Sequence, residues 1–455
     1  MAQTKHKEMD MLHGGLAGKL ILFALPLAFS SILQQLFNSD VAVVGRFAGD
    51  TALAAVGSCV ALVGIFVNLI VGLSVGPNAV LALLIGQNNR EEINRTLHTV
   101  ITFGAALGVG LMIVGWLTAK PILVLSGTPE SVLDQALLYI FIYFLSIPFM
   151  LVYNFGSAVL RSYGDSRRPM YYLLISGTVN VILNLFLVIA LQLGVAGVAI
   201  ATVISNVLSA GMVLTHLARR NDDFAFRFRR MHIEKTPLLR ILQIGIPAGI
   251  QGAIFSVSNV FIQSGINSFG ENAIAGSSLA LNFEYFTYDI ANAFAQAAVT
   301  FTSQNMGARR YDNLDRVMRN CLLCAAVTGL VLGGGASLLG EQLLHFYSSD
   351  EAVVTAGLAR MHIICTTYLL CGCMDVLASC LRGRGYSVLP MVVSLVGSCL
   401  LRLVWIATIF QLFRSTTTLY LSYPISWILT ALVHLGCLLV VRHKMKQEIS
   451  LTKVA

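Results

Sequence analysis

The sequence contains few charged residues for its length. Charged side chains make up 11% of its 455 residues, and hydrophobic ones make up 56%. A soluble domain carries roughly 25% charged residues, so this chain lacks the polar surface that a fold in water requires. The shortage of charge excludes an ordinary soluble domain and directs attention to the apolar segments.

The sequence patterns of common catalytic and metal-binding sites are absent as well. There is no Walker loop, no His-Glu-x-x-His motif and no soluble segment to hold a catalytic domain, so we expect no enzyme. The nine cysteines fall inside apolar segments, and their odd number argues against a disulfide framework. The pair Cys321-x-x-Cys324 is typical of small apolar fillers on lipid-embedded helices. We therefore expect neither a metal nor any other cofactor.

What the chain does have is a succession of long apolar segments. Each is about 20 residues or longer, enough to cross a hydrocarbon core about 30 Å thick. Because they are continuous and do not alternate apolar with polar residues, they predict helices rather than a β-barrel. We expect an all-α polytopic membrane protein whose twelve transmembrane helices cover residues 18–45, 52–80, 94–117, 131–157, 169–190, 195–218, 238–264, 273–300, 317–340, 352–380, 389–412 and 418–441.

The distribution of basic residues predicts the orientation. The polar opening has no apolar h-region and no cleavage site, so we expect no removable signal peptide. With both termini cytoplasmic, the 30 Lys and Arg all lie on the cytoplasmic side except Arg46, Lys120, Arg360, Arg402 and Arg414. The net charge of +8 then lies against anionic membrane lipids and predicts no nucleic-acid partner. The expected location is a bacterial cell (inner) membrane.

An internal repeat divides the chain in two. At a shift of 221 positions Pro26 falls on Pro247 and Asn38 on Asn259, while Gln87-Asn88 matches Gln304-Asn305 at a shift four residues shorter. Two six-helix lobes in tandem are a transporter arrangement. We expect an N-terminal lobe at 1–218, a cytoplasmic linker loop at 219–237 and a C-terminal lobe at 238–455.

Four acidic residues lie inside predicted spans. They are Asp40, Glu284, Asp289 and Asp375. An acid at the centre of a spanning helix costs on the order of 2.5–3.5 kcal/mol, so each should face protein or water and is a candidate functional residue. The alternative for each is a structural acid that is hydrogen-bonded between helices.

Polar residues on the fifth span extend this set. Asn180 and Asn184 are four apart, share one helix face and lie at a depth similar to that of Asp40. They could hydrogen-bond that acid, or they could be ordinary interhelical contacts. Arg402 is the one basic residue predicted deep in a span, and we expect it to pair with Glu284.

Several sequence segments resemble multidrug and toxic compound extrusion (MATE) transporters. The similarity extends over nearly the whole chain and is carried by Pro26, Asn38-Ser39-Asp40, Val44-Gly45-Arg46, Ala52-x-Ala54-Ala55, Gln87-Asn88, Leu160-Arg161-Ser162-Tyr163-Gly164-Asp165-Ser166, Gln304-Asn305-Met306-Gly307-Ala308 and Leu381-Arg382-Gly383-Arg384-Gly385.

The resemblance implies a V-shaped MATE fold and a secondary-active antiporter. Such a protein exports organic cations or drugs by alternating access in exchange for protons or sodium, and we expect it to act as a monomer. In the resemblance Asp40 is the coupling acid, with Asn180, Asn184 and Thr202 as polar neighbours. The full candidate set is Asp40, Asn154, Asn180, Asn184, Thr202, Gln251, Glu284, Asp289, Asp375 and Arg402.

Departures from the family pattern leave some alternatives open. Many members carry Asp where this chain has Asn184. The span-seven glutamate of a sodium-coupled branch would fall near Phe255, with only Gln251 close by, which favours proton coupling through Asp40. The alternative function is a lipid or lipid-linked saccharide flippase of similar fold. A flippase should line its cavity with several Arg or Lys.

Overall fold

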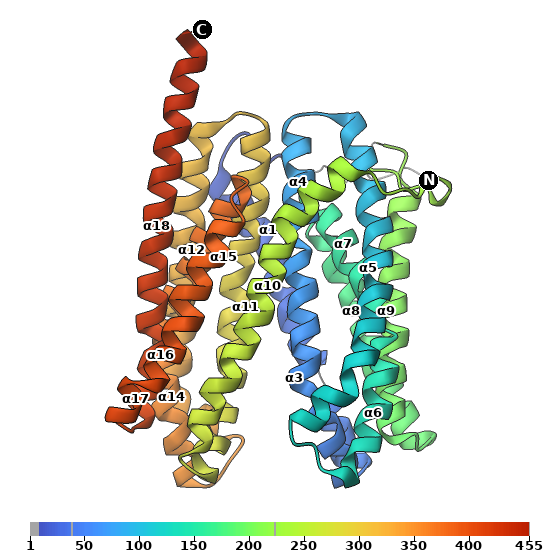
Figure 1. Ribbon diagram of the computed structural model, residues 1–455, viewed down its shortest axis with the longest axis vertical. Coiled ribbons are helices and arrows are strands. Elements are labelled where there is room, and N and C mark those ends of the chain that lie inside the picture. Colours follow the sequence, from blue (N-terminus) through green and yellow to red (C-terminus); the bar gives the residue numbers. More distant parts are fainter. Residues whose placement is uncertain (1–8, 38–39, 223, 455) are drawn as a thin grey trace. The chain divides into compact units, whose positions relative to one another are not determined.

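The computed structural model describes residues 9–37, 40–222 and 224–454, and every regular element in these ranges is a helix (Figure 1). The all-α prediction is confirmed. The helices of the first half, with a π-helical turn η1 and a 3-10 turn η2, are α1 (Leu16–Phe37), α2 (Asp40–Phe47), α3 (Asp50–Leu73), α4 (Val75–Gly86), α5 (Arg90–Leu125), α6 (Glu130–Phe144), α7 (Ile147–Ser162), α8 (Arg167–Leu185), η1 (Phe186–Ala190), α9 (Gly194–Ala218) and η2 (Phe228–Arg230).

The second half continues in the same way, again with one π-helical turn. Its elements are α10 (Lys235–Asn267), α11 (Glu271–Gly307), α12 (Tyr311–Leu338), α13 (Gly340–His345), α14 (Glu351–Gly383), α15 (Val388–Ser394), η3 (Leu395–Leu400), α16 (Leu401–Ala407), α17 (Ile409–Leu412) and α18 (Thr416–Val454).

The described helices correspond to the predicted spans. Ten helical segments are long and apolar enough to cross a membrane, and the bent pair α6 and α7 supplies another. These two helices meet at an angle of 41° just before Pro148, which cannot donate a backbone hydrogen bond to the preceding turn. The remaining predicted span is α11, which has 37 residues and carries Glu284 and Asp289.

The sequence repeat is also a repeat of backbone geometry. Gly49 and Gly270, 221 positions apart, have φ of 87° and 91° before a long helix, and Gly164 and Gly385 have φ of 97° and 92° after one. Only glycine adopts this left-handed region without strain.

One predicted alignment within the repeat is wrong. Asn88 and Arg309, also 221 apart, have φ of 54° and 56°. Asn88 is therefore equivalent to Arg309 in backbone geometry, and the match of Gln87-Asn88 with Gln304-Asn305 is four residues out of that register.

The helices pack into two compact units. Of the described residues, unit 1 contains 9–11 and 29–253, and unit 2 contains 12–28 and 254–454. The first part of α1 thus packs in unit 2, and the first part of α10 packs in unit 1. These units differ from the predicted lobes at those two helices, and the division at 218 and 238 stays a prediction about the repeat.

Within unit 1, glycines bring two helical segments into backbone contact. A Cβ atom on Gly72 of α3 would lie 2.5 Å from the carbonyl oxygen of Ala248 in α10, and one on Gly76 of α4 would lie 2.4 Å from that of Ile241. Gly245 of α10 faces the backbone of Leu73 in the same way. No larger residue fits these positions, so the first part of α10 is fixed against α3 and α4.

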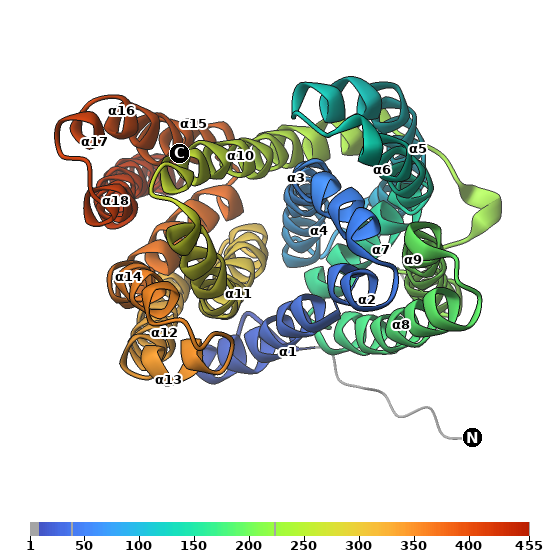
Figure 2. The same cartoon turned by 90° about the horizontal axis from the view of Figure 1, so that it is seen from below.

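Unit 2 is organised around α14, which packs against α11, α12 and α18 (Figure 2). Its apolar core includes Ile364, Tyr368 and Met374 of α14 with Tyr420 and Trp427 of α18. This arrangement places polar side chains of α11 and α14 opposite one another in the interior of the unit.

Candidate functional site

The predicted coupling acid, Asp40, is the first residue of α2. The predicted span at 18–45 is described as α1 up to Phe37 and as α2 from Asp40 onward. The side chain of Asp40 and residues 38–39 lie outside the part of the chain that the structure describes. Helix α2 itself lies beside α8, α9 and η1 within unit 1. The backbone of α2 is therefore next to the helices that carry the predicted polar neighbours.

Those neighbours form a buried cluster, which we call the amide cluster. Asn184 Nδ2 donates a hydrogen bond to Asn180 Oδ1 at 3.2 Å, so the predicted shared face on α8 is present. Asn180 Nδ2 lies 3.4 Å from both Thr202 Oγ1 and Ser205 Oγ of α9. All four side chains are at most 9% exposed. The cluster joins α8 to α9 through side chains alone.

Sequence reasoning missed one member of the amide cluster. Ser205 is three residues after Thr202, so the two share a helix face. The Ser205 hydroxyl also donates to the carbonyl oxygen of Thr202 at 2.9 Å. The i, i+3 spacing from Thr202 could have identified it.

Two other predicted residues of unit 1 are also on helices. Asn154 Nδ2 donates to the carbonyl oxygen of Met150, one turn earlier in α7, at 2.8 Å, so this hydrogen bond stays within its own helix. Gln251 is buried in α10 and is 6% exposed.

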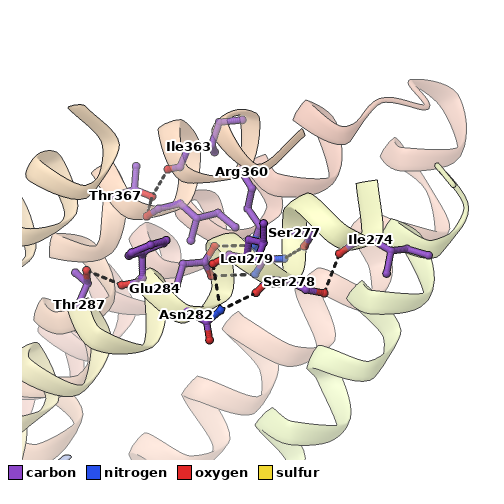
Figure 3. Close-up of polar contacts among 12 residues, drawn as sticks. Ile274, Ser277, Ser278, Leu279, Asn282, Glu284, Thr287, Arg360, Ile363 and Thr367 are labelled. Atoms are coloured by element: carbon purple, nitrogen blue, oxygen red, sulfur yellow. Dashed lines mark hydrogen bonds and ion pairs between the residues drawn. The ribbon is translucent and has the colours of Figure 1, made fainter. Parts of the chain in front are cut away.

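In unit 2, Glu284 has a different partner from the predicted one. Arg360 Nε and Nη2 donate to the two carboxylate oxygens of Glu284 at 2.5 and 2.9 Å, and Nη1 donates to Ser277 Oγ at 2.7 Å. Figure 3 shows these side chains meeting between α11 and α14. The predicted pair of Glu284 with Arg402 is wrong, because a second arginine, Arg360, is also buried and occupies both carboxylate oxygens of Glu284.

Arg402 is instead accommodated by a hydroxyl and aromatic rings. Its Nε donates to Ser426 Oγ at 3.0 Å, and its guanidinium carbon lies 4.3 Å from the ring centre of Tyr423 and 5.6 Å from that of Trp427. An aromatic face attracts a cation, more strongly where water is excluded. A second buried arginine is thus held in unit 2 without a carboxylate.

The two remaining acids of unit 2 differ from Glu284 and from each other. Asp375 of α14 interacts electrostatically with the hydroxyl of Tyr288 in α11, and that hydroxyl accepts a hydrogen bond from Asn292 Nδ2 at 2.8 Å. Asp289 is half-buried and has no hydrogen-bond or ion-pair partner among the described residues. Of the three acids predicted inside the spans of unit 2, Asp289 and Asp375 lack a cationic hydrogen-bond partner in the described chain.

No metal centre is built into the described residues. No group of three or more His, Cys, Asp or Glu side chains there is arranged to hold a metal ion. The chemistry available is that of buried carboxylates, amides and hydroxyls within helices, which can bind and release a proton or a cation. Such a set inside apolar spans is typical of the ion and substrate pathways of membrane transporters.

Comparison with known proteins specifies the family. The MatE family model matches residues 26–186 and again residues 247–408. The two matched segments begin 221 positions apart, which confirms the internal repeat at that offset. The chain belongs to the MatE family, as the sequence resemblance predicted.

Relatives and solved structures agree with this assignment. The probable multidrug resistance protein YoeA of Bacillus subtilis (strain 168) is 29% identical over 382 residues, which cover 82% of each chain. A crystal structure of MATE in complex with MaL6 has a TM-score of 0.90 at 19% identity and covers 97% of this chain and 100% of its own. The Vibrio cholerae MATE transporter VcmN has a TM-score of 0.86 at 20% identity, covering 95% and 97%. These structures establish a shared fold.

Proposed function

We propose that this chain is a secondary-active antiporter of a bacterial cell membrane that exports lipophilic organic cations in exchange for protons. Its curated relatives include proteins named for multidrug resistance and multidrug export. Asp40 is the residue at which drug and proton compete. The amide cluster of Asn180, Asn184, Thr202 and Ser205 supports the acid from α8 and α9.

One observation carries the proposal. Four buried, hydrogen-bonded polar side chains lie on the two helices next to α2, and α2 begins with an acidic residue. Buried polar residues in a spanning segment are costly and mark ion or substrate pathways. Amide and hydroxyl donors can stabilise a carboxylate in its ionised form, which is the form that attracts an organic cation.

The mechanism is competitive exchange at a shared carboxylate. An organic cation enters among apolar side chains and is held by the ionised acid. Protonation from the opposite side removes the negative charge, and the cation leaves. A proton that falls through the membrane potential gains about 2.3 kcal/mol for each 100 mV. That free energy supports roughly a fifty-fold concentration ratio of the exported cation.

The ion pair in unit 2 supports protons over sodium as the coupling ion. Glu284 already accepts two hydrogen bonds from Arg360, so its charge is compensated without a mobile cation. Sodium coupling would have to use Asp289 and Asp375. Those two acids make sodium the second candidate ion, because no basic side chain hydrogen-bonds them among the described residues.

The lipid flippase remains the alternative function. Recognition of a pyrophosphate would need several arginines or lysines free to face the ligand. Three arginines are buried among the described residues. Arg360 is engaged by Glu284, and Arg402 lies against Tyr423 and Trp427. Arg384 donates to the carbonyl oxygen of Cys380 at 3.3 Å. This arrangement supports export of cations over transfer of an anionic lipid.

The test uses the purified protein in proteoliposomes loaded with a fluorescent lipophilic cation, with proton and sodium gradients imposed separately. We expect movement driven by the proton gradient and its loss in Asp40→Asn. Asp312→Asn, which removes an exposed acid at the start of α12, is the matched control and should transport normally. Full transport by Asp40→Asn would contradict the carrier role.

Two further outcomes would redirect the assignment. Movement driven only by sodium would place coupling at Asp289 and Asp375. No movement under either gradient, with labelled phospholipid transferred instead, would support the flippase.

A further inference from the structure

The segment between the two sequence halves is folded against unit 1. Arg227 N–H donates to His98 Nε2 at 3.1 Å, and Glu234 N–H donates to Thr99 Oγ1 at 3.2 Å, both on α5. Asn94 Nδ2 of α5 also donates to the carbonyl oxygen of Ala225 at 3.4 Å. These hydrogen bonds, spread over about ten residues, hold residues 224–234 as an ordered part of unit 1.

This ordered segment forms one wall of an open groove, which we call the linker groove. The groove has a volume of about 910 Å³. The start of α5 and the end of α9 form the other walls. The basic and aromatic side chains that line it are Arg90, Phe226, Arg227, Phe228, Arg229 and Arg230.

The described acids that line the linker groove are already paired with arginines. Asp222 accepts from Arg220 Nε at 2.8 and 2.9 Å, and Glu91 accepts from Arg95 Nη2 at 2.5 Å. Arg229 and Arg230 are exposed, and their side chains form no hydrogen bond or ion pair within the described residues. Among the residues that the structure describes, the groove therefore presents cationic groups whose charge no acid compensates.

Apolar side chains stand next to these cations on the same segment. Phe228, Met231 and Ile233 are 58%, 45% and 45% exposed. The groove lies at the ends of two candidate spans: α5 begins there at Arg90, and α9 finishes there at Ala218. Alternation of exposed apolar and basic residues at the end of a span matches the boundary between headgroups and acyl chains.

We propose that the linker groove binds the phosphate of an anionic phospholipid headgroup. Arg229 and Arg230 contact the phosphate, for which the planar guanidinium offers paired donors. Phe228 and Met231 insert beside the headgroup among the first acyl carbons. The exposed apolar residues favour a lipid over a free phosphate, because a soluble anion would leave them in water.

This site is separate from the transport chemistry and does not rest on the proposed function. It lies on the predicted cytoplasmic side, where anionic lipids attract basic segments. Each arginine near such a surface contributes roughly a five-fold gain in binding. Loss of both Arg229 and Arg230 should weaken binding of an anionic lipid about thirty-fold.

The experiment measures binding of phosphatidylglycerol and phosphatidylcholine to the full-length protein in detergent by native mass spectrometry. We expect Arg229→Gln/Arg230→Gln to lose phosphatidylglycerol binding selectively, and Phe228→Ser to weaken it less. Arg316→Gln/Arg319→Gln is the matched control, because it also removes two arginines, from the start of α12. Unchanged unfolding temperatures would show that each variant is folded.

Three results would overturn the proposal. Equal losses in the groove variant and in the control would mean that binding follows net charge alone. Equal binding of phosphatidylcholine would remove the role of the anionic headgroup. If millimolar inorganic phosphate displaced the lipid, and if Phe228→Ser bound phosphatidylglycerol as well as the unchanged protein does, the groove would be a site for a free anion.

Discussion

Arg360 donates hydrogen bonds to both carboxylate oxygens of Glu284, and each of these side chains is only 2% exposed. The pair connects α11 to α14 in the interior of unit 2, and Ser277 takes a further hydrogen bond from the guanidinium. Tyr420 and Tyr423 lie 5.6 and 5.9 Å from the guanidinium carbon by their ring centres. Two opposite charges thus occupy an apolar interior with their hydrogen-bonding groups engaged.

Removal of one partner of this pair should be costly. Arg360→Met leaves the Glu284 carboxylate buried without a cation, and we expect it to lower the free energy of unfolding by about 3–5 kcal/mol. The double variant Glu284→Leu/Arg360→Met should recover most of that loss, because two apolar groups replace two charges. Denaturant unfolding in detergent micelles measures both effects.

Arg402→Met is the control for this prediction. It also removes a buried arginine, but one whose hydrogen bond goes to the Ser426 hydroxyl and leaves no carboxylate behind. Its effect should be smaller than that of Arg360→Met. Equal destabilisation by the single and double variants at Glu284 and Arg360 would contradict the interpretation.

An acid introduced into the amide cluster, in addition to Asp40, should shift the pH range of transport. A carboxylate next to a second carboxylate binds a proton more firmly, because protonation removes the repulsion between the two negative charges. Under the proposed function, Asn184→Asp should move the pH profile of proton-driven export to higher pH. Proteoliposome assays across a pH series measure the shift, and Asn154→Asp, outside the cluster, should leave the profile in place.

Close packing of α3 against α10 should tolerate no side chain at Gly72. A Cβ atom there would lie 2.5–2.7 Å from the backbone of Ala248 and Gly249. We expect Gly72→Ala to destabilise the protein by about 1–3 kcal/mol. Gly64 lies on the same helix, and a methyl group added to it would meet no atom within 4 Å. Gly64→Ala should therefore be neutral or stabilising by up to about 1 kcal/mol. Thermal unfolding compares the two.

The linker segment should loosen in acid. Partial burial would raise the pKa of Asp222, but hydrogen bonds and charge from Arg220, with the Phe224 N–H, outweigh burial and lower that pKa below its ordinary value. A lowered pKa means that the interaction stabilises the folded segment above the ordinary pKa of an aspartate. The stabilisation is lost as the pH falls through the lowered pKa.

Hydrogen exchange at residues 217–226 measures this effect. Asp222→Asn should exchange faster than the parent protein at neutral pH and should show a weaker dependence on pH in the acidic range. Faster exchange spread equally over the whole chain would instead point to global destabilisation.

The sequence predicted the periodic features of this protein well. Continuous apolar runs fix the helices, and the 221-residue repeat recurs as matching φ angles at Gly49 and Gly270. The shared face of Asn180 and Asn184 followed from helical spacing, and a hydrogen bond between them confirms it. Periodicity along one helix is information that a single sequence contains.

Contacts between different helices were harder to predict. Arg360 was predicted only to lie away from the cytoplasmic side, because Arg402 was taken as the one basic residue deep in a span. The orientation of α14 about its own axis determines that Arg360 points toward Glu284 of α11. This orientation depends on packing between helices, which no local sequence pattern specifies. For the same reason the sequence did not indicate that Arg402 would lie on aromatic rings of α18.

The chain changes from one compact unit to the other inside helices and not in loops. These changes fall between Ala28 and Phe29 in α1 and between Ala253 and Ile254 in α10. A loop absorbs an inserted residue by bulging, whereas one residue inserted in a helix rotates the following part of that helix by about 100°. Evolution can therefore lengthen or shorten the exposed loops of this protein, but α1 and α10 must keep their number of residues at these two positions.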